Sequence, residues 1–179
     1  MDCAIVGCSR ITRTQALAFT ARHPIGSVAG TIFDVVTSLE IDPAFALAEA
    51  ILETGWGTSR LARNRHNWYG YQAYYGHPDA AHAFTSDEDG IRIPLQDMAT
   101  NYFSPAGTSY ADGGGTTLAG WAKEWVDGNP RHWQSACRAI LSLMQSAMQC
   151  AQRMRTDGQA NAHGSSLMAT ICCSRAGPS

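Results

Sequence analysis

Residues 42–59 read DPAFALAEAILETGWGTS and begin with a clear helical pattern. Asp42 is a favourable N-cap, and Pro43 suits the first helical position. Apolar side chains recur at helical spacing over one broad face: Phe45, Leu47, Ala48, Ile51 and Leu52. Thr54-Gly55 is a typical C-terminal signal. The pattern therefore predicts a largely buried helix that carries Glu53 in its last turn.

Three effects are expected to raise the pKa of Glu53. The helix dipole disfavours an anion in the last turn, and Glu49 lies one turn earlier on the same face. Burial near Trp56 acts in the same direction. A raised pKa would suit Glu53 as a general acid at neutral pH. The competing interpretation is a solvated glutamate, or one paired with Arg60 or Arg63.

Aromatic residues and glycines follow this helix at short intervals. A glycine-bracketed Trp56 comes first, and Asn67-Trp68-Tyr69-Gly70-Tyr71 comes next. Flat aromatic rings are surfaces on which sugars can stack. The stacking candidates are Trp56, Trp68, Tyr69, Tyr71, Tyr74 and Tyr75. The alternative is that half of them belong to the core, with Trp68 the first of these.

Residues 46–59, together with 61–62 and 67–70, resemble the core of the glucosaminidase-type peptidoglycan hydrolases. These are the endo-β-N-acetylglucosaminidases of glycoside hydrolase family 73, which include autolysins, flagellar wall-piercing enzymes and phage lysins. The resemblance is strong over residues 42–71 and weaker to about residue 148. It implies that Glu53 is the catalytic acid and that Asn67 and Gly70 line the sugar site. The implied fold is mainly α: a lysozyme-like helical domain with a small β-hairpin, placed at residues 68–86.

The chain departs from this family at the second catalytic position. Many members carry another glutamate in the hairpin, whereas residues 71–83 contain only one carboxylate, Asp79. The family's tyrosine after an Asn-Pro pair is also replaced here, by Arg131-His132-Trp133. Asp79 is therefore the candidate second catalytic residue. A distant carboxylate could activate water with inversion, or the substrate's own N-acetyl group could attack.

The pattern along the chain divides it into three parts. Residues 1–10 are expected to form a loose arm, residues 11–150 the catalytic domain, and residues 151–179 a disordered tail. The last clear helix is expected at residues 131–149.

Composition excludes several classes of function. The chain has 179 residues and a formal charge of −2, so it has no global attraction to nucleic acid. No apolar run is long enough to span a bilayer, and no signal peptide is visible at the N-terminus. Histidine and cysteine spacings predict neither a metal site nor a cofactor, and the six cysteines are expected to be mostly free thiols. We expect a monomer that acts on glycan strands at the bacterial cell wall by an unknown export route.

The expected function is hydrolysis of the β-1,4 bond after N-acetylglucosamine. A muramidase or a lytic transglycosylase would use a related helical site with one glutamate. A wall-binding module that has lost catalysis is the non-enzymatic alternative, and the absent hairpin glutamate favours it.

Overall fold

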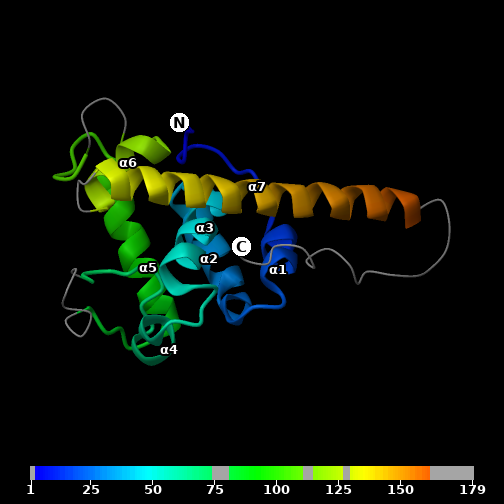
Figure 1. The fold of residues 1–179 in the computed structure, drawn as a ribbon, viewed down its shortest axis with the longest axis horizontal. Helices are drawn as coiled ribbons and strands as arrows, with labels where there is room; N and C mark the ends of the chain where they lie inside the picture. The colour runs from blue at the N-terminus through cyan, green and yellow to red at the C-terminus, as the bar shows by residue number, and fades with distance from the viewer. Residues whose placement is uncertain (1–2, 74–80, 111–114, 127–129, 162–179) are drawn as a thin grey trace.

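The computed structural model describes residues 3–73, 81–110, 115–126 and 130–161, with the backbone alone for 157–161. The described part is mainly helical, which confirms the expected class. Its elements are α1 (Arg13–Thr20), η1 (Pro24–Ser27), α2 (Ala29–Ser38), α3 (Pro43–Thr54), α4 (Arg60–Arg65), α5 (Asp87–Asp97), the π-helical η3 (Met98–Tyr102), α6 (Leu118–Trp125) and α7 (Pro130–Asn161). Figure 1 shows the long α7 along one side of the molecule, with α1 to α5 below it.

Helix α3 occupies the centre of the core. The Asp42 carboxylate caps it by accepting from the Ala44 N–H at 3.1 Å, and Gly55 ends it with φ 54°. The helix packs against α2 on one side and α7 on another. Phe45 lies edge-on against Trp121 of α6, with ring centroids 4.9 Å apart. The expected buried helix is therefore confirmed.

Residues 3–10 form a strap that is packed against the domain, so the expectation of a loose arm is wrong for them. Ile5 is fully buried. Its N–H donates to the Thr116 carbonyl, and its carbonyl accepts from the Asp42 N–H, each at 2.9 Å. The Arg10 guanidinium forms an ion pair with the buried Asp42 carboxylate. The strap therefore joins the N-cap of α3 to the segment that precedes α6.

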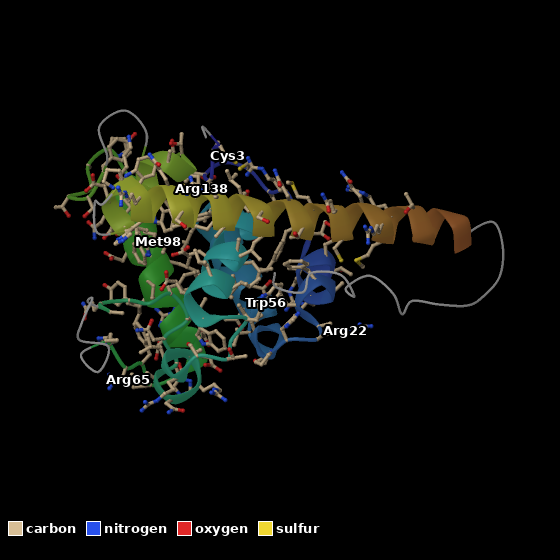
Figure 2. All side chains as sticks on the ribbon, viewed as in Figure 1. Cys3, Arg22, Trp56, Arg65, Met98 and Arg138 are labelled. Atoms are coloured by element: carbon tan, nitrogen blue, oxygen red, sulfur yellow. The ribbon has the colours of Figure 1, made fainter. Side chains whose placement is uncertain are left out.

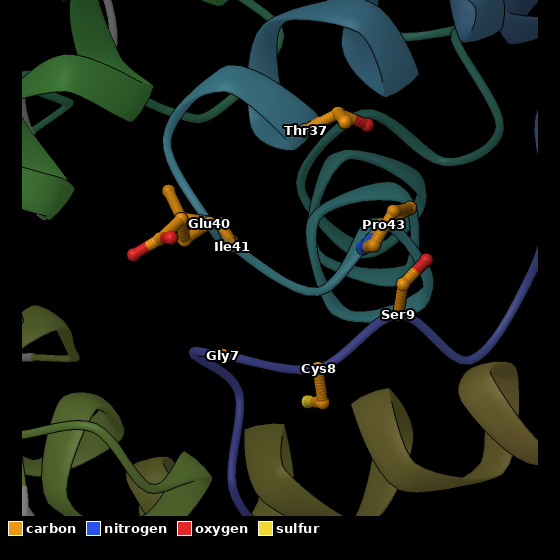
Figure 3. A pocket seen from close by; sticks show the side chains of 7 residues that line it. All are labelled: Gly7, Cys8, Ser9, Thr37, Glu40, Ile41 and Pro43. Atoms are coloured by element: carbon orange, nitrogen blue, oxygen red, sulfur yellow. The ribbon is translucent and has the colours of Figure 1, made fainter.

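A pocket of about 280 Å³ lies between this strap and the residues that lead into α3 (Figure 3). Gly7 and Cys8 line it on the strap side, and Glu40 and Pro43 on the other. Pro43 begins α3, whereas Glu53 lies in the last turn of the same helix. This pocket is therefore separate from the candidate active site.

The expected tail begins too early, because α7 continues through Asn161. Cys150 and Ala151 are buried, and the Gln15 side chain donates to the Ala151 carbonyl at 3.3 Å. Packing against α1 thus keeps residues beyond 149 in the helix. Residues 162–179 lie outside the described part.

The small hairpin expected at residues 68–86 is not shown. Neither 68–73 nor 81–86 contains a strand, and the intervening residues 74–80 lie outside the described part. Elsewhere the described chain has isolated bridges between Ala4 and Thr117 and between Val6 and Ile41.

Candidate active site

Glu53 lies in the last turn of α3 with its side chain exposed. Its carboxylate lies directly against Gly70, at a position where any side chain would collide. A Cβ built on Gly70 would be 3.2 Å from Glu53 Cδ and closer still to Oε2. Gly70 also has φ 61°, a conformation that glycine adopts without steric cost. The glycine therefore leaves room for the carboxylate and lets the loop approach it.

The segment after Glu53 turns through three consecutive residues in the left-handed region. Gly55, Trp56 and Gly57 have φ values of 54°, 63° and 83°. The buried Thr54 hydroxyl accepts from the Gly57 N–H at 2.9 Å, and its carbonyl accepts from the Ser59 N–H at 2.9 Å. These bonds hold the turn and begin α4, for which Ser59 is the N-cap.

Trp56 packs against the end of α1 and the residues after it. Its ring lies against the His23 ring in a tilted arrangement, with centroids 4.0 Å apart and planes inclined by 30°, and the Phe19 ring centroid lies 5.4 Å away. Figure 2 shows Trp56 on this side of the molecule. His23 covers one ring face, and the indole remains partly exposed. At most one face is therefore open to a sugar.

Asn67 is fully buried and closes the loop that carries Gly70. Its amide nitrogen donates to the carbonyls of Tyr71 at 2.9 Å and His82 at 3.0 Å, and its oxygen accepts from the Tyr71 N–H at 2.8 Å. These three bonds use the side chain inside the protein. Asn67 thus holds the loop on which Gly70 lies.

Trp68 and Tyr69, two of the stacking candidates, are buried in the structure. Trp68 is 4% exposed and its indole N–H donates to Asp87 at 2.9 Å. Tyr69 is fully buried, with its hydroxyl donating to the Ala46 carbonyl at 3.3 Å. Both side chains therefore belong to the packed interior of the described structure. Tyr71 is the member of the run that remains partly exposed, with its ring near His82 and Phe84.

The surroundings of Glu53 raise its pKa to about 7, and the cause is desolvation by neighbouring protein atoms. The carboxylate is both accessible from solvent and crowded by protein, which is the environment that a general acid needs. No ion pair joins it to Arg60, Arg63 or any other described residue. The alternative in which Glu53 is paired with an arginine is therefore not what the structure shows.

Glu49, one turn earlier, is 1% exposed and has its pKa raised well above the ordinary value, first by burial and then by the charge of Glu53. The sequence placed Glu49 beside Glu53, but it did not indicate that the side chain is enclosed. The sequence feature that could have indicated this burial was the position of Glu49 within an otherwise apolar helical run.

Asp79, Tyr74 and Tyr75 lie outside the described residues, so their roles stay predictions. Within the described part, no three histidine, cysteine or carboxylate side chains are grouped to hold a metal ion. A search of the same residues for a helix long and apolar enough to cross a membrane found none.

Comparison with known proteins identifies the family. The profile described as glucosaminidase, mannosyl-glycoprotein endo-beta-N-acetylglucosaminidase, matches residues 31–168, a range that includes Glu53, Asn67 and Gly70. A search of curated proteins found no match. The family match supports a glycoside hydrolase that acts on the glycan of peptidoglycan at the cell wall. Because the matched range covers most of the sequence, the chain belongs to the glucosaminidase family.

Proposed function

We propose that this protein is an endo-β-N-acetylglucosaminidase that cleaves the β-1,4 bond after N-acetylglucosamine in peptidoglycan, with Glu53 as the general acid. The observation that carries the proposal is the state of Glu53. Its side chain is exposed, its pKa is raised to about 7, and its carboxylate lies against a glycine that leaves space beside it. The family match supplies the substrate class.

In this mechanism Glu53 donates its proton to the leaving glycosidic oxygen as the bond to the sugar breaks. A carboxyl of ordinary pKa would be almost fully ionised at pH 7 and unable to donate. Desolvation keeps about half of the Glu53 population protonated at that pH. The turn held by Thr54 and the loop closed by Asn67 place the acid and Gly70 together.

The second step requires a nucleophile for the anomeric carbon. Glu49 is the carboxyl whose titration is linked to that of Glu53, but its burial prevents it from holding a water molecule against the sugar. Two routes remain in the proposal: Asp79 activates water, or the substrate N-acetyl oxygen attacks and water opens the resulting ring. A loss of less than tenfold in Asp79→Asn would favour the substrate-assisted route, since tenfold corresponds to about 1.4 kcal/mol of barrier.

Sugar contacts are assigned to Trp56 and Tyr71, which are partly exposed among the stacking candidates that the structure describes. Gly70 contributes its open surface beside the acid. Trp68, Tyr69 and Asn67 act one layer below by holding the loop, because all three are buried. We propose that the protein binds glycan strands as a monomer.

The deciding experiment is analysis of the products from purified cell wall. A glucosaminidase leaves N-acetylglucosamine at the new reducing end, so borohydride reduces that sugar and leaves muramic acid intact. Reduced muramic acid would identify a muramidase, and anhydro ends would identify a lytic transglycosylase. Wall binding without any released saccharide would identify a non-catalytic module.

Glu53→Gln tests the acid itself, because the amide preserves the shape and removes the proton. We expect loss of lysis with unchanged secondary structure. Glu88→Gln makes the same chemical change on an exposed glutamate of α5 and should keep full activity. Near-normal turbidity clearance by folded Glu53→Gln would overturn the assignment.

A further inference from the structure

The other glutamate of α3, Glu49, lies in surroundings that do not stabilise a negative charge. Glu49 is 1% exposed, and neither carboxyl oxygen makes a hydrogen bond. No ion pair joins it to a described residue either. An unpaired carboxylate in the protein interior costs far more than a neutral acid, so such groups retain their proton instead.

Three other elements surround this carboxyl. Trp125 of α6 approaches it and partly offsets the rise in its pKa, although the indole N–H does not meet hydrogen-bond geometry. Tyr69 lies on the loop that carries Gly70, and Cys137 lies on α7. The titratable neighbours are thus Glu53, Tyr69 and Cys137, each neutral or negative. A charge on Glu49 would meet no compensating cation among the groups that interact with it.

We propose that Glu49 is a positioning residue that must remain an uncharged acid, so that alkaline pH places a charge at the junction of α3, α6 and α7 and loosens the helix that carries Glu53. The expected effect of Glu49 on wall lysis rests on the proposed function of Glu53. The expected effect on stability does not. The contact pattern itself is a property of the fold. The Gly70 loop is included in the junction, because Tyr69 packs there with its hydroxyl bonded to the Ala46 carbonyl.

The proposal predicts a particular dependence of stability on pH. In the unfolded chain Glu49 releases its proton near the ordinary value of 4.5, whereas in the folded protein it keeps the proton to much higher pH. Above 4.5 the folded state therefore holds one proton that the unfolded state has lost. The folding equilibrium constant then falls about tenfold for each pH unit from this group alone, until the folded carboxyl ionises.

Glu49→Gln isolates this effect, because the amide has the same shape and no ionisable proton. Urea unfolding of wild type, Glu49→Gln and the exposed α6 control Glu124→Gln would be measured between pH 4.5 and 8.5. We expect the ratio of folding constants, Glu49→Gln over wild type, to rise about tenfold per pH unit. Glu124→Gln should give no such trend. A ratio that stays constant or falls with pH would overturn the proposal.

A direct titration covers the case in which Glu49→Gln fails to fold. Wild-type protein with ¹³C-labelled glutamate carboxyl groups should show one buried signal that keeps the chemical shift of the protonated acid well above the pH at which an ordinary glutamate ionises. If every glutamate signal except that of Glu53 titrates near 4.5, Glu49 is charged in the folded protein and the proposal fails.

Activity provides the readout that separates positioning from chemistry. At pH 6, Glu49→Gln should retain wall lysis within about threefold of wild type, because the amide reproduces the uncharged shape. A loss above tenfold with an intact fold would mean that the proton of Glu49 takes part in the reaction, contrary to the proposal. Because the unfolding and NMR measurements need no substrate, a failure of Glu53 as the acid would appear separately, as full activity of Glu53→Gln.

Discussion

Replacement of Gly70 by alanine tests whether this position places the Glu53 carboxylate, the proposed catalytic acid. Two costs follow from the structure. Alanine at φ 61° adopts a left-handed conformation that costs about 1–2 kcal/mol. The new Cβ would also lie 3.2 Å from Glu53 Cδ and closer to Oε2, so the flexible carboxylate must rotate away.

The two costs appear in different measurements. The backbone cost should lower the melting temperature by about 2–8 °C for a protein of this size. Displacement of the acid by about 1 Å should reduce the rate of wall lysis about 100-fold, or roughly 2.7 kcal/mol of barrier. Stability should therefore change modestly while activity falls severely.

Gly7→Ala is a matched control. Gly7 has φ 70°, and a Cβ built there has no atom within 4 Å. It lies on the strap near the beginning of α3, a helix about 18 Å long, whereas Glu53 is in the last turn. Gly7→Ala should lose similar stability and keep its activity. Equal lysis rates for folded Gly70→Ala and Gly7→Ala would refute the placement of Glu53 by Gly70.

Four further outcomes are expected. In the proposed mechanism the protonated form of Glu53 is the active one, and its pKa is raised to about 7, so the rate of lysis should fall as pH rises through about 7; a rate that increases there would contradict the assignment. Asn67→Ala removes three hydrogen bonds of a buried side chain and should cost roughly 3 kcal/mol in urea unfolding; a cost below 1 kcal/mol would show that the loop does not depend on these bonds. Asp42→Ala removes the α3 cap and leaves Arg10 without its buried partner, so we expect the free energy of unfolding in urea to fall by about 3–5 kcal/mol. Asp34→Ala, which breaks the exposed Arg13–Asp34 pair, should change that free energy little. Activity in excess EDTA should match the untreated control, and loss that zinc or calcium restores would contradict a metal-free mechanism.

The parts of the site that were predictable are those that depend on neighbours in the sequence. Helical spacing, the Asp42 cap and Gly55 were sufficient to predict α3 and to place Glu53 in its last turn. A raised pKa for Glu53 was also expected, and the structure attributes it to desolvation, which was one of the three expected causes. The Trp56 ring packs against His23 and Phe19, contacts that the sequence did not indicate.

The aromatic run shows where local pattern stops being informative. Trp68, Tyr69 and Tyr71 are adjacent in sequence and similar in chemistry, yet the first two are buried and the third is partly exposed. A loop has no fixed period, so the direction of each ring depends on the surfaces packed around it. Asp87 of α5 and the Ala46 carbonyl of α3 provide the hydrogen-bond partners that hold Trp68 and Tyr69 inside.

The sequence by itself determined the helical class, the position of Glu53 in the last turn of α3 and the family, because helix caps, apolar spacing and the Gly-Trp-Gly element act over a few residues. Only the tertiary structure decided that the strap pairs Ile5 with Thr116 and that Gly70 lies against Glu53. It also decided that the Glu49 carboxyl is buried without a hydrogen-bond partner that would stabilise its charge. These features join residues that are distant in the chain or belong to separate elements, and their free energy arises from burial and close contact that exist only after the helices have packed together.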